Sequence, residues 1–447
     1  MNILHYSLGF PPYRSGGMTK FCMDLMKEQK NAGHRVSLLW PGEMTLISRA
    51  IRIRGKETRY GIFSYEVINP LPVPYDEGID HTNRYMDSGD FNAFHRLLEE
   101  IHPDIIHVHT LMGLYESFLA AAKDSGIRVV FSAHDFFPIC SKVTMFRNGV
   151  ICNTVKDCSV CDKCNETALK MAEIRLLQSA FYRTMKDSSV VKRIRRRHRN
   201  RFLGEIDKKS RRRGGKSVGT AEDYIALRGY YRKMLDHADI IHFNSLLTKH
   251  VYEKYIKTEG RDVVIPITHA DIKDNRRRKE FGKTLRMTYL GPQGQGKGFY
   301  VLKEALDELW SERQDFILNV FFTPTEKSPY FKVRDNFQHK DMEDLFEKTD
   351  VLIAPSMMYE TFGYTVFEAL SYGVPVIISD RVGAKDIVPR DGGTVVENMD
   401  VRSLKKAIGG LSPAALSRQN EAICSAGMCF DISKMSQRIM QECYEAC

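Results

Sequence analysis

Short apolar runs alternate with amphipathic stretches along most of the chain. Near the amino terminus, an apolar run at 2–7 precedes a loop rich in proline and glycine, a helical stripe of apolar residues over 18–31, and a second apolar run at 35–40. This order predicts a strand, a loop, a helix and a strand, which together form a βαβ unit. Further strand-like runs occupy residues 104–109, 128–133 and 239–244.

The second half of the chain shows the same alternation. Strands are predicted at 286–290, 316–322, 351–354 and 376–379, and helices at 299–311, 341–347 and 364–372. Two halves of alternating strand and helix predict an α/β protein with two doubly wound, Rossmann-like domains that face each other across a cleft.

Breaks in this pattern suggest the domain boundaries. Residues 1–267 are expected to form the N-terminal domain, with insertions at about 140–235 that interrupt the alternation. The charged stretch 268–283 is predicted to be a linker, and residues 284–425 to form the second domain. The chain closes with a predicted helix over 432–447.

The composition is that of an ordinary globular protein, with 43% hydrophobic and 27% charged residues. No apolar run approaches the roughly 20 residues that cross a bilayer. The first residues lack the basic start and apolar stretch of a signal peptide. We therefore expect a cytoplasmic protein.

The net charge of +10 is concentrated in one segment, because residues 183–216 contain 15 Lys or Arg and 3 acidic residues. Such a segment could attract the anionic inner face of a membrane as a peripheral contact, or grip an acidic acceptor. Nucleic acid is not the expected partner, because Phe202 is the only aromatic residue in the basic run available to stack on bases. A solvated loop is the remaining alternative.

Five cysteines, Cys140, Cys152, Cys158, Cys161 and Cys164, fall within 25 residues. The first four could supply four thiolates to a structural zinc ion. The C-x₂-C-x₂-C spacing that ends at Cys164 is also compatible with iron–sulfur ligation. Free or redox-active thiols are the third interpretation.

Two carboxylates eight positions apart, Glu360 and Glu368, flank a glycine-containing turn that follows the apolar run 350–356. A strand, a turn and a helix start place backbone N–H groups where they can hold a phosphate. The pattern suits a nucleotide-bearing ligand, with one acid at the reacting end and the other at the ribose. An ordinary acidic helix start is the alternative.

Two glycine-rich loops occupy equivalent positions after the first strand of each half. Gly16 and Gly17 form the first loop, and the second, 291–298, includes Lys297 as a positive charge for a diphosphate. Neither loop has the spacing of a dinucleotide fingerprint or of a P-loop. A structural turn and a flexible surface loop, respectively, are the alternatives.

Three histidines on or next to predicted strands are candidates for a functional role. His134 directly follows the run 128–133, where a side chain is expected to face the cleft and contact a sugar hydroxyl or take part in proton transfer. His107 and His109 lie on another strand. We expect these two on opposite faces, one lining the cleft and the other packed inside.

Taken together, these features resemble glycosyltransferase family 4, whose members have the GT-B fold. The resemblance covers nearly the whole chain. It rests on residues 16–17, 32–36, 103–109, 133–135, 296–298 and 360–375, the last being the E-x₇-E element of the family. It implies a retaining transferase that moves a sugar from a nucleotide-diphosphate donor to a glycan or lipid-linked (polyprenyl-linked) glycan acceptor, in cell-surface polysaccharide biosynthesis.

The resemblance also implies roles for individual residues. Glu360 and His134 would act at the transferred sugar, Glu368 would bind the ribose, and Lys297 would bind the diphosphate. Other donor-binding positions would be Gly16, Gly17, Thr361, Phe362, Gly363, Tyr364 and Thr365. No divalent cofactor would be required, and the terminal helix, 426–447, would pack back on the N-terminal domain.

One position departs from the family pattern, because Pro292 stands where the phosphate loop commonly has an arginine. Lys297, or a basic residue from elsewhere such as Arg14, would then neutralise the diphosphate. Two other functions remain open from the sequence. One is a glycan phosphorylase on the same fold, and the other is a non-catalytic protein that binds sugar or nucleic acid.

Overall fold

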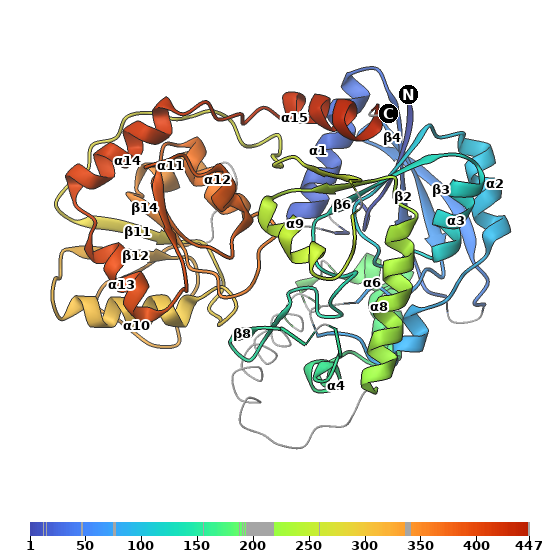
Figure 1. Ribbon diagram of the computed structural model, residues 1–447, viewed down its shortest axis with the longest axis horizontal. Helices are drawn as coiled ribbons and strands as arrows, with labels where there is room; N and C mark the ends of the chain where they lie inside the picture. Colours follow the sequence, from blue (N-terminus) through green and yellow to red (C-terminus); the bar gives the residue numbers. More distant parts are fainter. Residues whose placement is uncertain are drawn as a thin grey trace.

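The computed structural model describes residues 1–445 apart from 12, 15, 46–47, 75–76, 155, 187, 190, 192, 194–218, 259 and 336–340. The chain forms two lobes side by side, each built around its own sheet (Figure 1). Most of the basic run predicted from the sequence lies outside the described residues.

The N-terminal lobe contains an eight-stranded sheet. In spatial order its strands are β10 (Asp262–Val264), β9 (Ile240–Phe243), β6 (Arg128–Ala133), β5 (Ile105–Val108), β1 (Asn2–Tyr6), β2 (Arg35–Pro41), β4 (Ile62–Ile68) and β3 (Arg52–Arg59). Neighbouring strands are parallel except β3, which runs antiparallel to β4. The predicted strands of this half are confirmed.

The hairpin of β3 and β4 was not predicted. The sequence of β3 is largely charged, so it shows no apolar run, and it forms the edge of the sheet. Its turn contains Tyr60 and Gly61, both with positive φ. Two successive positive φ values are typical of the tight turns that suit the twist of a two-stranded hairpin.

The helices of this lobe are α1 (Gly17–Asn31), η1 (Thr82–Tyr85), α2 (Phe91–Ile101), α3 (Glu116–Asp124), α8 (Ala221–Asp236) and α9 (Leu246–Glu253). The inserted region adds the short strands β7 (Phe146–Arg147) and β8 (Val150–Ile151) and the helices α4 (Cys161–Cys164), α5 (Met171–Leu177) and α6 (Ala180–Met185). Helix α8 follows the insertion and returns to the core.

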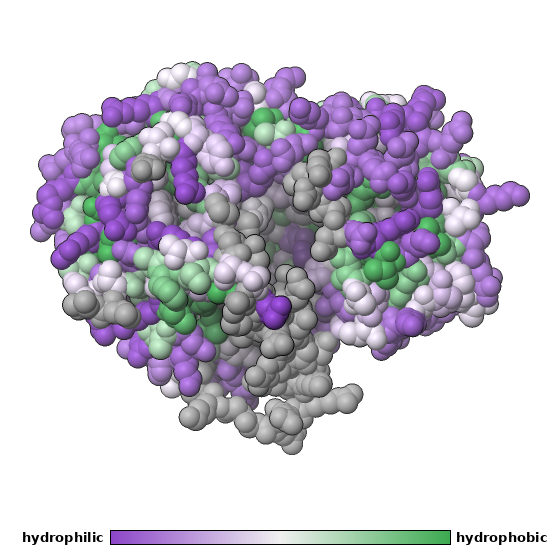
Figure 2. Space-filling view, turned by 180° about the vertical axis from the view of Figure 1, so that it is seen from behind, coloured by the Kyte–Doolittle hydropathy of each residue, from purple (hydrophilic) through white to green (hydrophobic). Residues whose placement is uncertain are grey.

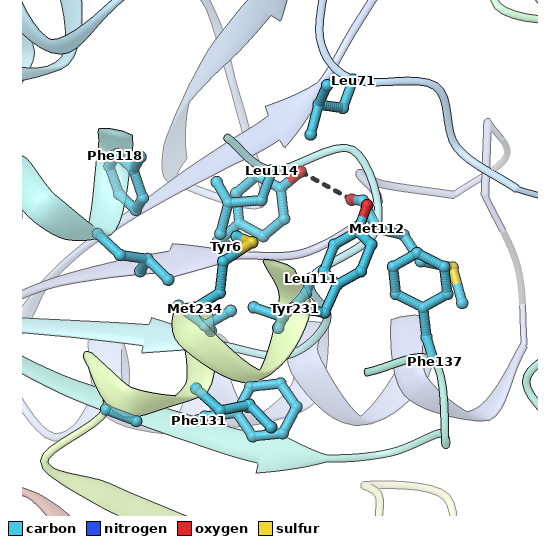
Figure 3. Close-up of a cluster of buried hydrophobic side chains, with 14 of the residues drawn as sticks. Tyr6, Leu71, Leu111, Met112, Leu114, Phe118, Phe131, Phe137, Tyr231 and Met234 are labelled. Carbon is cyan, nitrogen blue, oxygen red and sulfur yellow. Dashed lines mark hydrogen bonds between the residues drawn. The ribbon is translucent and has the colours of Figure 1, made fainter. Parts of the chain in front are cut away.

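The main core of this lobe lies between the sheet and α8 (Figure 3). Tyr6 of β1 and Phe131 of β6 pack against the inner face of α8, which contributes Tyr231 and Met234. All four side chains are at most 2% exposed. The buried Tyr6 hydroxyl donates to the carbonyl of Met112 at 2.9 Å, so its polar end is satisfied.

The second lobe contains a six-stranded parallel sheet. Its strands, in spatial order, are β13 (Phe331–Val333), β12 (Phe316–Val320), β11 (Leu285–Tyr289), β14 (Val351–Ala354), β15 (Val376–Ser379) and β16 (Gly393–Val396). Its helices are α10 (Phe299–Trp310), α11 (Met342–Glu347), α12 (Tyr364–Ser371), η3 (Gly383–Ile387), α13 (Val401–Gly409) and α14 (Pro413–Ser425). The predicted strands and helices of this half are confirmed within a few residues.

The strand order of each sheet reverses next to its first strand. In the first sheet the reversal falls between β1 and β5, and in the second between β11 and β14. The loops that leave the carboxyl ends of strands at such a point diverge to opposite faces of the sheet and leave a crevice for ligands. In this protein those loops include the glycine-containing segments singled out from the sequence.

Two segments join the lobes. Residues 268–283 form no helix or strand, but they are held in place by hydrogen bonds, including one from the amide of Ala270 to Asp24 at 2.9 Å. At the other end of the chain, α15 (Ile432–Ile439) and a π-helical turn, η4 (Met440–Tyr444), lie on the N-terminal lobe beside α1 (Figure 1). The predicted helix over 432–447 therefore ends its α-helical part at Ile439.

Hydrophilic side chains cover much of both lobes in the view of Figure 2, and the surface is hollowed between them. Among the described residues, no helix is both long and apolar enough to cross a bilayer.

A buried carboxylate attaches the insertion to the sheet. The side chain of Glu66, on β4, is 0% exposed and contacts Arg54, Lys56 and Arg183 at 2.8, 3.3 and 2.7 Å. Burial alone would raise the pKa of Glu66, but hydrogen bonds from Arg183 and Arg54 outweigh it and lower the pKa. Arg183, counted in the basic segment from the sequence, thus has an internal partner, and its guanidinium also lies over Trp40.

Replacing Glu66 with Ala should destabilise the protein by about 2–3 kcal/mol, because it leaves partly buried guanidinium groups without a counter-charge. The midpoint of urea unfolding measures the effect. Glu308→Ala is the matched control, since Glu308 pairs with Lys405 on the surface and should cost well under 1 kcal/mol. Equal shifts for the two variants would contradict a structural role for Glu66.

Candidate functional site

The first candidate loop connects β1 to α1. Gly16 is the residue before α1 and has φ of 122°, a conformation that favours glycine. Gly17 begins the helix, and a Cβ added to it would meet the ring of Tyr364, in the other lobe, at 2.9 Å. The absence of a side chain at Gly17 therefore lets the start of α1 approach the start of α12 closely.

The second candidate loop connects β11 to α10 and is tied down internally. The hydroxyl of Tyr289, at the end of β11, donates to the carbonyl of Pro292 at 2.9 Å. Gly298 precedes α10 with φ of 75°, and a Cβ there would lie 1.8 Å from the carbonyl oxygen of Pro355. The loop is thus a defined turn, and Gly298 orients Lys297, the residue before it.

The third candidate loop connects β14 to α12 and contains Glu360. The carbonyl of Thr361 accepts hydrogen bonds from the hydroxyls of Ser245 at 2.6 Å and Thr248 at 2.8 Å. The hydroxyl of Thr361 donates to the carbonyl of His134 at 3.0 Å. Because Ser245, Thr248 and His134 belong to the N-terminal lobe, this loop is a hydrogen-bonded contact between the lobes.

The remaining predicted residues of this loop have distinct surroundings. The Phe362 side chain is 3% exposed and packs with Phe367, so a ligand could meet only its backbone. Gly363 precedes α12 with φ of 99°, and Tyr364 and Thr365 begin the helix. The hydroxyl of Tyr364 is buried without a hydrogen-bond partner among the described residues.

The helices that follow these three loops share an unusual start. Each of α1, α10 and α12 is preceded by glycine, has no side-chain hydrogen bond to its first amides, and has no acidic residue in its first turn. By contrast, Asp, Ser or Thr side chains cap α2, α6, α8, α9, α13, α14 and α15. The first N–H groups of a helix and its dipole attract anions. The three glycine-capped helices therefore offer amide donors that no side chain occupies.

The three helix starts meet in space. Gly17 of α1 lies against Tyr364 of α12. The Nζ of Lys297, next to the start of α10, lies 2.7 Å from the Oε2 of Glu360, and a Cβ on Gly363 would be 3.9 Å from that oxygen. The structure thus brings Glu360, Lys297 and the amide-rich helix starts into one place. Lys297 and Glu360 form an ion pair with each other, a contact that the sequence did not predict.

Glu368 lies farther along α12 and is 8% exposed. Its Oε1 is 3.4 Å from the Nε2 of His269, in the segment between the lobes, and the His269 ring lies 5.0 Å from that of Tyr364. His269 was missed because residues 268–283 read as a featureless charged linker. Only the path of that segment across the cleft shows that it reaches Glu368.

His134 follows β6, with its ring 4.8 Å from that of Phe21. Its Nε2 lies 3.2 Å from the Nδ1 of His109, and the rings of His109 and His107 stack at 4.1 Å. The expectation that His107 and His109 face opposite ways was wrong, because residues two positions apart on a strand share a face. Both are fully buried beneath His134, and neither lines the cleft.

Burial keeps this histidine cluster neutral. Loss of hydration is the main reason that the pKa of His134 falls to about 3 and those of His5 and His242 to about 4. The same cause, with nearby rings adding to it, holds the pKa values of His107 and His109 well below 6.5. A neutral imidazole carries one N–H donor and one acceptor nitrogen.

The predicted four-thiolate zinc site is not formed in this geometry. Within the described part of the chain, three candidate metal ligands lie within 4.8 Å of one another only in a histidine trio, His5, His107 and His109. The guanidinium of Arg228, on α8, instead lies 2.8 Å from the Sγ of Cys158 and 3.1 Å from that of Cys161. Within the described residues, Cys140 and Cys152 do not complete a set of three close ligands with that pair, and none of the four forms a disulfide.

Pro292, at the position where the family commonly has an arginine, carries no charge and is part of a hydrogen-bonded turn. Pro292 accepts a hydrogen bond within its own turn, and Arg14 lies 5.2 Å from the ring centre of Tyr13. The hairpin of β7 and β8 reaches the same loop, since a Cβ on Gly296 would come within 3.8 Å of Phe146. This contact of the insertion with the Lys297 loop had no signal in the sequence.

Several solved structures share this two-lobed arrangement. They include sucrose-phosphate synthase from Thermosynechococcus elongatus, with 14% identity, a TM-score of 0.55 and coverage of 99% of this chain and 98% of that one. A glycosyltransferase from Rickettsia africae has 13% identity, a TM-score of 0.56 and coverage of 99% and 98%. Anabaena HepE in complex with UDP-glucose has 12% identity, a TM-score of 0.54 and coverage of 100% of both chains. The fold is therefore GT-B, the two-lobed fold of these glycosyltransferases.

Family comparisons agree with the fold. Residues 15–159 match Glycosyltransferase Family 4, and residues 287–412 match Glycosyl transferases group 1. These ranges together cover more than half of the chain and include the loops that precede α10 and α12. The chain belongs to the family 4 type of GT-B glycosyltransferases and is an enzyme of that class. No curated protein sequence matches it.

Gly298→Ala should disrupt the Lys297 loop, because its Cβ would overlap the Pro355 carbonyl and its φ is positive. We expect a loss of about 2 kcal/mol or more in stability of the second lobe, measured by urea unfolding. Gly294→Ala, in the same loop, is the matched control, since a Cβ there meets nothing within 4 Å. Similar unfolding midpoints for the two variants would contradict this description of the loop.

The buried histidines predict acid sensitivity. Above pH 6.5 they are neutral in both the folded and the unfolded chain, so they do not change stability with pH. Below pH 6.5 the unfolded chain binds protons that the folded one cannot accept until about pH 3–4, so stability falls as pH falls. Each ring contributes about 1.4 kcal/mol per pH unit in that window.

The urea midpoint, measured between pH 7 and pH 5, tests this dependence. His5→Gln should flatten the slope by about one proton, because it removes one of the buried neutral rings. Stability that stays level from pH 7 to pH 5 would show that the histidines are not buried as neutral rings.

Proposed function

We propose that the protein is a retaining glycosyltransferase that moves a sugar from a nucleotide-diphosphate donor to a glycan or lipid-linked glycan acceptor. One observation carries the proposal: three helix starts without side-chain caps meet around Glu360 and Lys297. Sites of this construction bind phosphate groups through backbone N–H donors and helix dipoles. Anabaena HepE, which shares the fold, has been solved with UDP-glucose.

The diphosphate is both the anchor of the donor and the leaving group. Each helix start acts as about half a positive charge, so three of them and Lys297 offset most of the charge that develops on the departing diphosphate. This arrangement takes over the task that the absent arginine at position 292 would perform. It also removes the electrostatic need for a divalent cation, so we propose turnover in the presence of EDTA.

The donor enters by replacing one contact of Lys297. In this structure, the Nζ of Lys297 lies 2.7 Å from the Oε2 of Glu360 and neutralises its charge. We propose that Lys297 turns to the diphosphate when the donor binds. Glu360 is then released to face the transferred sugar, where a carboxylate stabilises positive charge that develops at the anomeric carbon.

The two ends of the donor have separate partners. We assign the ribose hydroxyls to Glu368, which the contact with His269 holds in place. The amides of Thr361, Phe362, Gly363, Tyr364 and Thr365 are assigned to the phosphates, and Gly16 and Gly17 let the first loop close over them. His134, beside Thr361 across the cleft, is assigned to the transferred sugar.

The acceptor is assigned to the N-terminal lobe and its insertion. Helices α5 and α6 expose Leu176, Phe181 and Met185 at 56, 69 and 43%. The basic run at 192–213 follows them directly in sequence. Exposed apolar residues next to many cations are typical of segments that lie on an anionic bilayer. This supports a lipid-linked acceptor reached from the membrane surface, as a peripheral contact on its inner face.

The test is a panel of UDP-, ADP- and GDP-sugars assayed for thermal stabilisation, hydrolysis and transfer. At least one should bind and release its nucleoside diphosphate. Glu360→Gln should lower kcat by at least 100-fold with little change in donor binding, because it removes charge stabilisation in the transition state. Glu368→Gln should mainly raise the donor KM, about 10-fold for the loss of a charged hydrogen bond.

Glu397→Gln, a carboxylate outside the three loops, is the matched control and should behave as the unmodified protein. The anomeric configuration of the product, read by NMR, tests retention. Failure of every nucleotide sugar to bind would refute the proposal. Formation of a sugar 1-phosphate from glycan and orthophosphate would replace it with a phosphorylase.

A further inference from the structure

A continuous chain of hydrogen bonds runs beneath His134 through the interior of the N-terminal lobe. From the far end its contacts are Ile265 O to His242 Nε2 (2.8 Å), His242 Nδ1 to Ser132 Oγ (2.7 Å), Ser132 Oγ to His107 Nε2 (2.7 Å), His107 Nδ1 to Tyr444 Oη (2.6 Å), Tyr444 Oη to Gln29 Nε2 (3.0 Å), Gln29 Oε1 to His5 Nε2 (2.7 Å), His5 Nδ1 to His109 Nε2 (2.9 Å) and His109 Nδ1 to His134 Nε2 (3.2 Å). It links four strands of the sheet with α1 and the terminal turn η4.

The hydrogen bond to Ile265, at the far end of this series, determines which group donates the proton in each of the other bonds. The carbonyl of Ile265 can only accept, so His242 donates from Nε2 and its Nδ1 is an acceptor. Ser132 must therefore donate its one proton to His242, and it accepts from the Nε2–H of His107. The Nδ1 of His107 is then an acceptor, and only the Tyr444 hydroxyl can supply its proton.

The direction continues from Tyr444 to the site. Having donated to His107, the Tyr444 oxygen accepts from the amide of Gln29, whose own oxygen accepts from the Nε2–H of His5. The Nδ1 of His5 then accepts from the Nε2–H of His109. By the same rule, the Nδ1 of His109 accepts from the Nε2–H of His134.

No other arrangement satisfies every contact with neutral rings. Turning the amide of Gln29 over would reverse the chain from Tyr444 to Ser132. His242 would then have to donate from both nitrogens, as an imidazolium. Its burial opposes that charge. The same bonds occupy both nitrogens of His5, His107 and His109, the trio with the spacing of a metal site, so these rings act as hydrogen-bonding links.

We propose that this chain holds His134 as the Nε2–H tautomer and leaves Nδ1 as a hydrogen-bond acceptor for the donor. Nδ1 of His134 makes no hydrogen bond to any residue that the structure describes. Gln29 and Tyr444 are positioning residues that act on His134 through three and four successive hydrogen bonds, respectively. This inference rests on the proposed role of His134 at the transferred sugar.

The tautomer restricts which sugars fit. A neutral ring with only a lone pair to offer accepts from a hydroxyl or an amide N–H, and it repels a carboxylate. The site should therefore favour a neutral sugar that presents a hydroxyl to His134 over the corresponding uronic acid. Tyr444 follows the second lobe in the chain, so this preference depends on the terminal segment lying on the N-terminal lobe.

The direct test is histidine-labelled ¹⁵N NMR of the full-length protein without ligand, which distinguishes the two neutral tautomers by their nitrogen shifts. His134→Asn assigns the His134 signals. In the unmodified protein His134 should be protonated at Nε2. Tyr444→Phe removes the one hydroxyl that sets the direction for Gln29 and the residues beyond it, so His134 should become a mixture of tautomers.

Tyr6→Phe is the matched control, because it removes another buried tyrosine hydroxyl of the same lobe, bonded to Met112 and outside the chain. Its His134 should remain protonated at Nε2. Protonation at Nδ1 in the unmodified protein, or an unchanged tautomer in Tyr444→Phe, would overturn the inference. If Tyr444→Phe does not fold, Gln29→Met interrupts the chain at the next link and carries the same expectation.

Donor binding gives a second readout. With two tautomers equally populated, half of the molecules present the acceptor nitrogen, so the apparent donor Kd should rise about twofold in Tyr444→Phe and not in Tyr6→Phe. UDP-glucose and UDP-glucuronate are the probes. If His134 shows the expected tautomers but neither probe binds, these two nucleotide sugars are not the donors. The inference about the hydrogen-bond chain would still stand. Tighter binding of UDP-glucuronate than of UDP-glucose would contradict the inferred preference.

Discussion

Backbone amides without side-chain partners are the constraint around which this molecule is organised. A helix start left uncapped loses stability, and seven other helices of this chain avoid that cost with Asp, Ser or Thr. The three glycine-capped helices leave first-turn amides without side-chain caps at the carboxyl ends of parallel strands, and in α10 the amide of Phe299 donates to the carbonyl of Gly294 at 3.3 Å. An anion can accept hydrogen bonds from such amides, so the uncapped helix starts form a site for phosphate.

Glycine shapes these helix starts in two ways. At Gly298 and Gly363 the backbone has positive φ, and at Gly17 the missing side chain lets two helices from different lobes meet. The contact of Thr361 with His134 joins the same two lobes by a hydrogen bond. The site is therefore assembled by the closeness of the lobes, and neither lobe contains it alone.

A buried polar interior supports the site from below. Large proteins usually fill the space under a sheet with apolar side chains, and this lobe does so on the face covered by α8. On the other face, histidines, a serine, a glutamine and a tyrosine satisfy one another in sequence. Such a network specifies one arrangement of protons because every member has a partner and none is charged. The terminal turn of the chain supplies one link, which ties its docking to the site.

The sequence by itself determined the alternation of strands and helices, the glycine loops and the pair of glutamates, because these follow from local periodicity and local turn chemistry. It could not show that Lys297 pairs with Glu360, that His269 reaches Glu368, or that Tyr444 lies beside His107, since each contact joins residues far apart in the chain. It also suggested a four-thiolate metal site, and the tertiary structure placed Arg228 beside Cys158 and Cys161 instead. Spacing along a chain limits which residues can meet, and only the packing of the lobes decides which of them do.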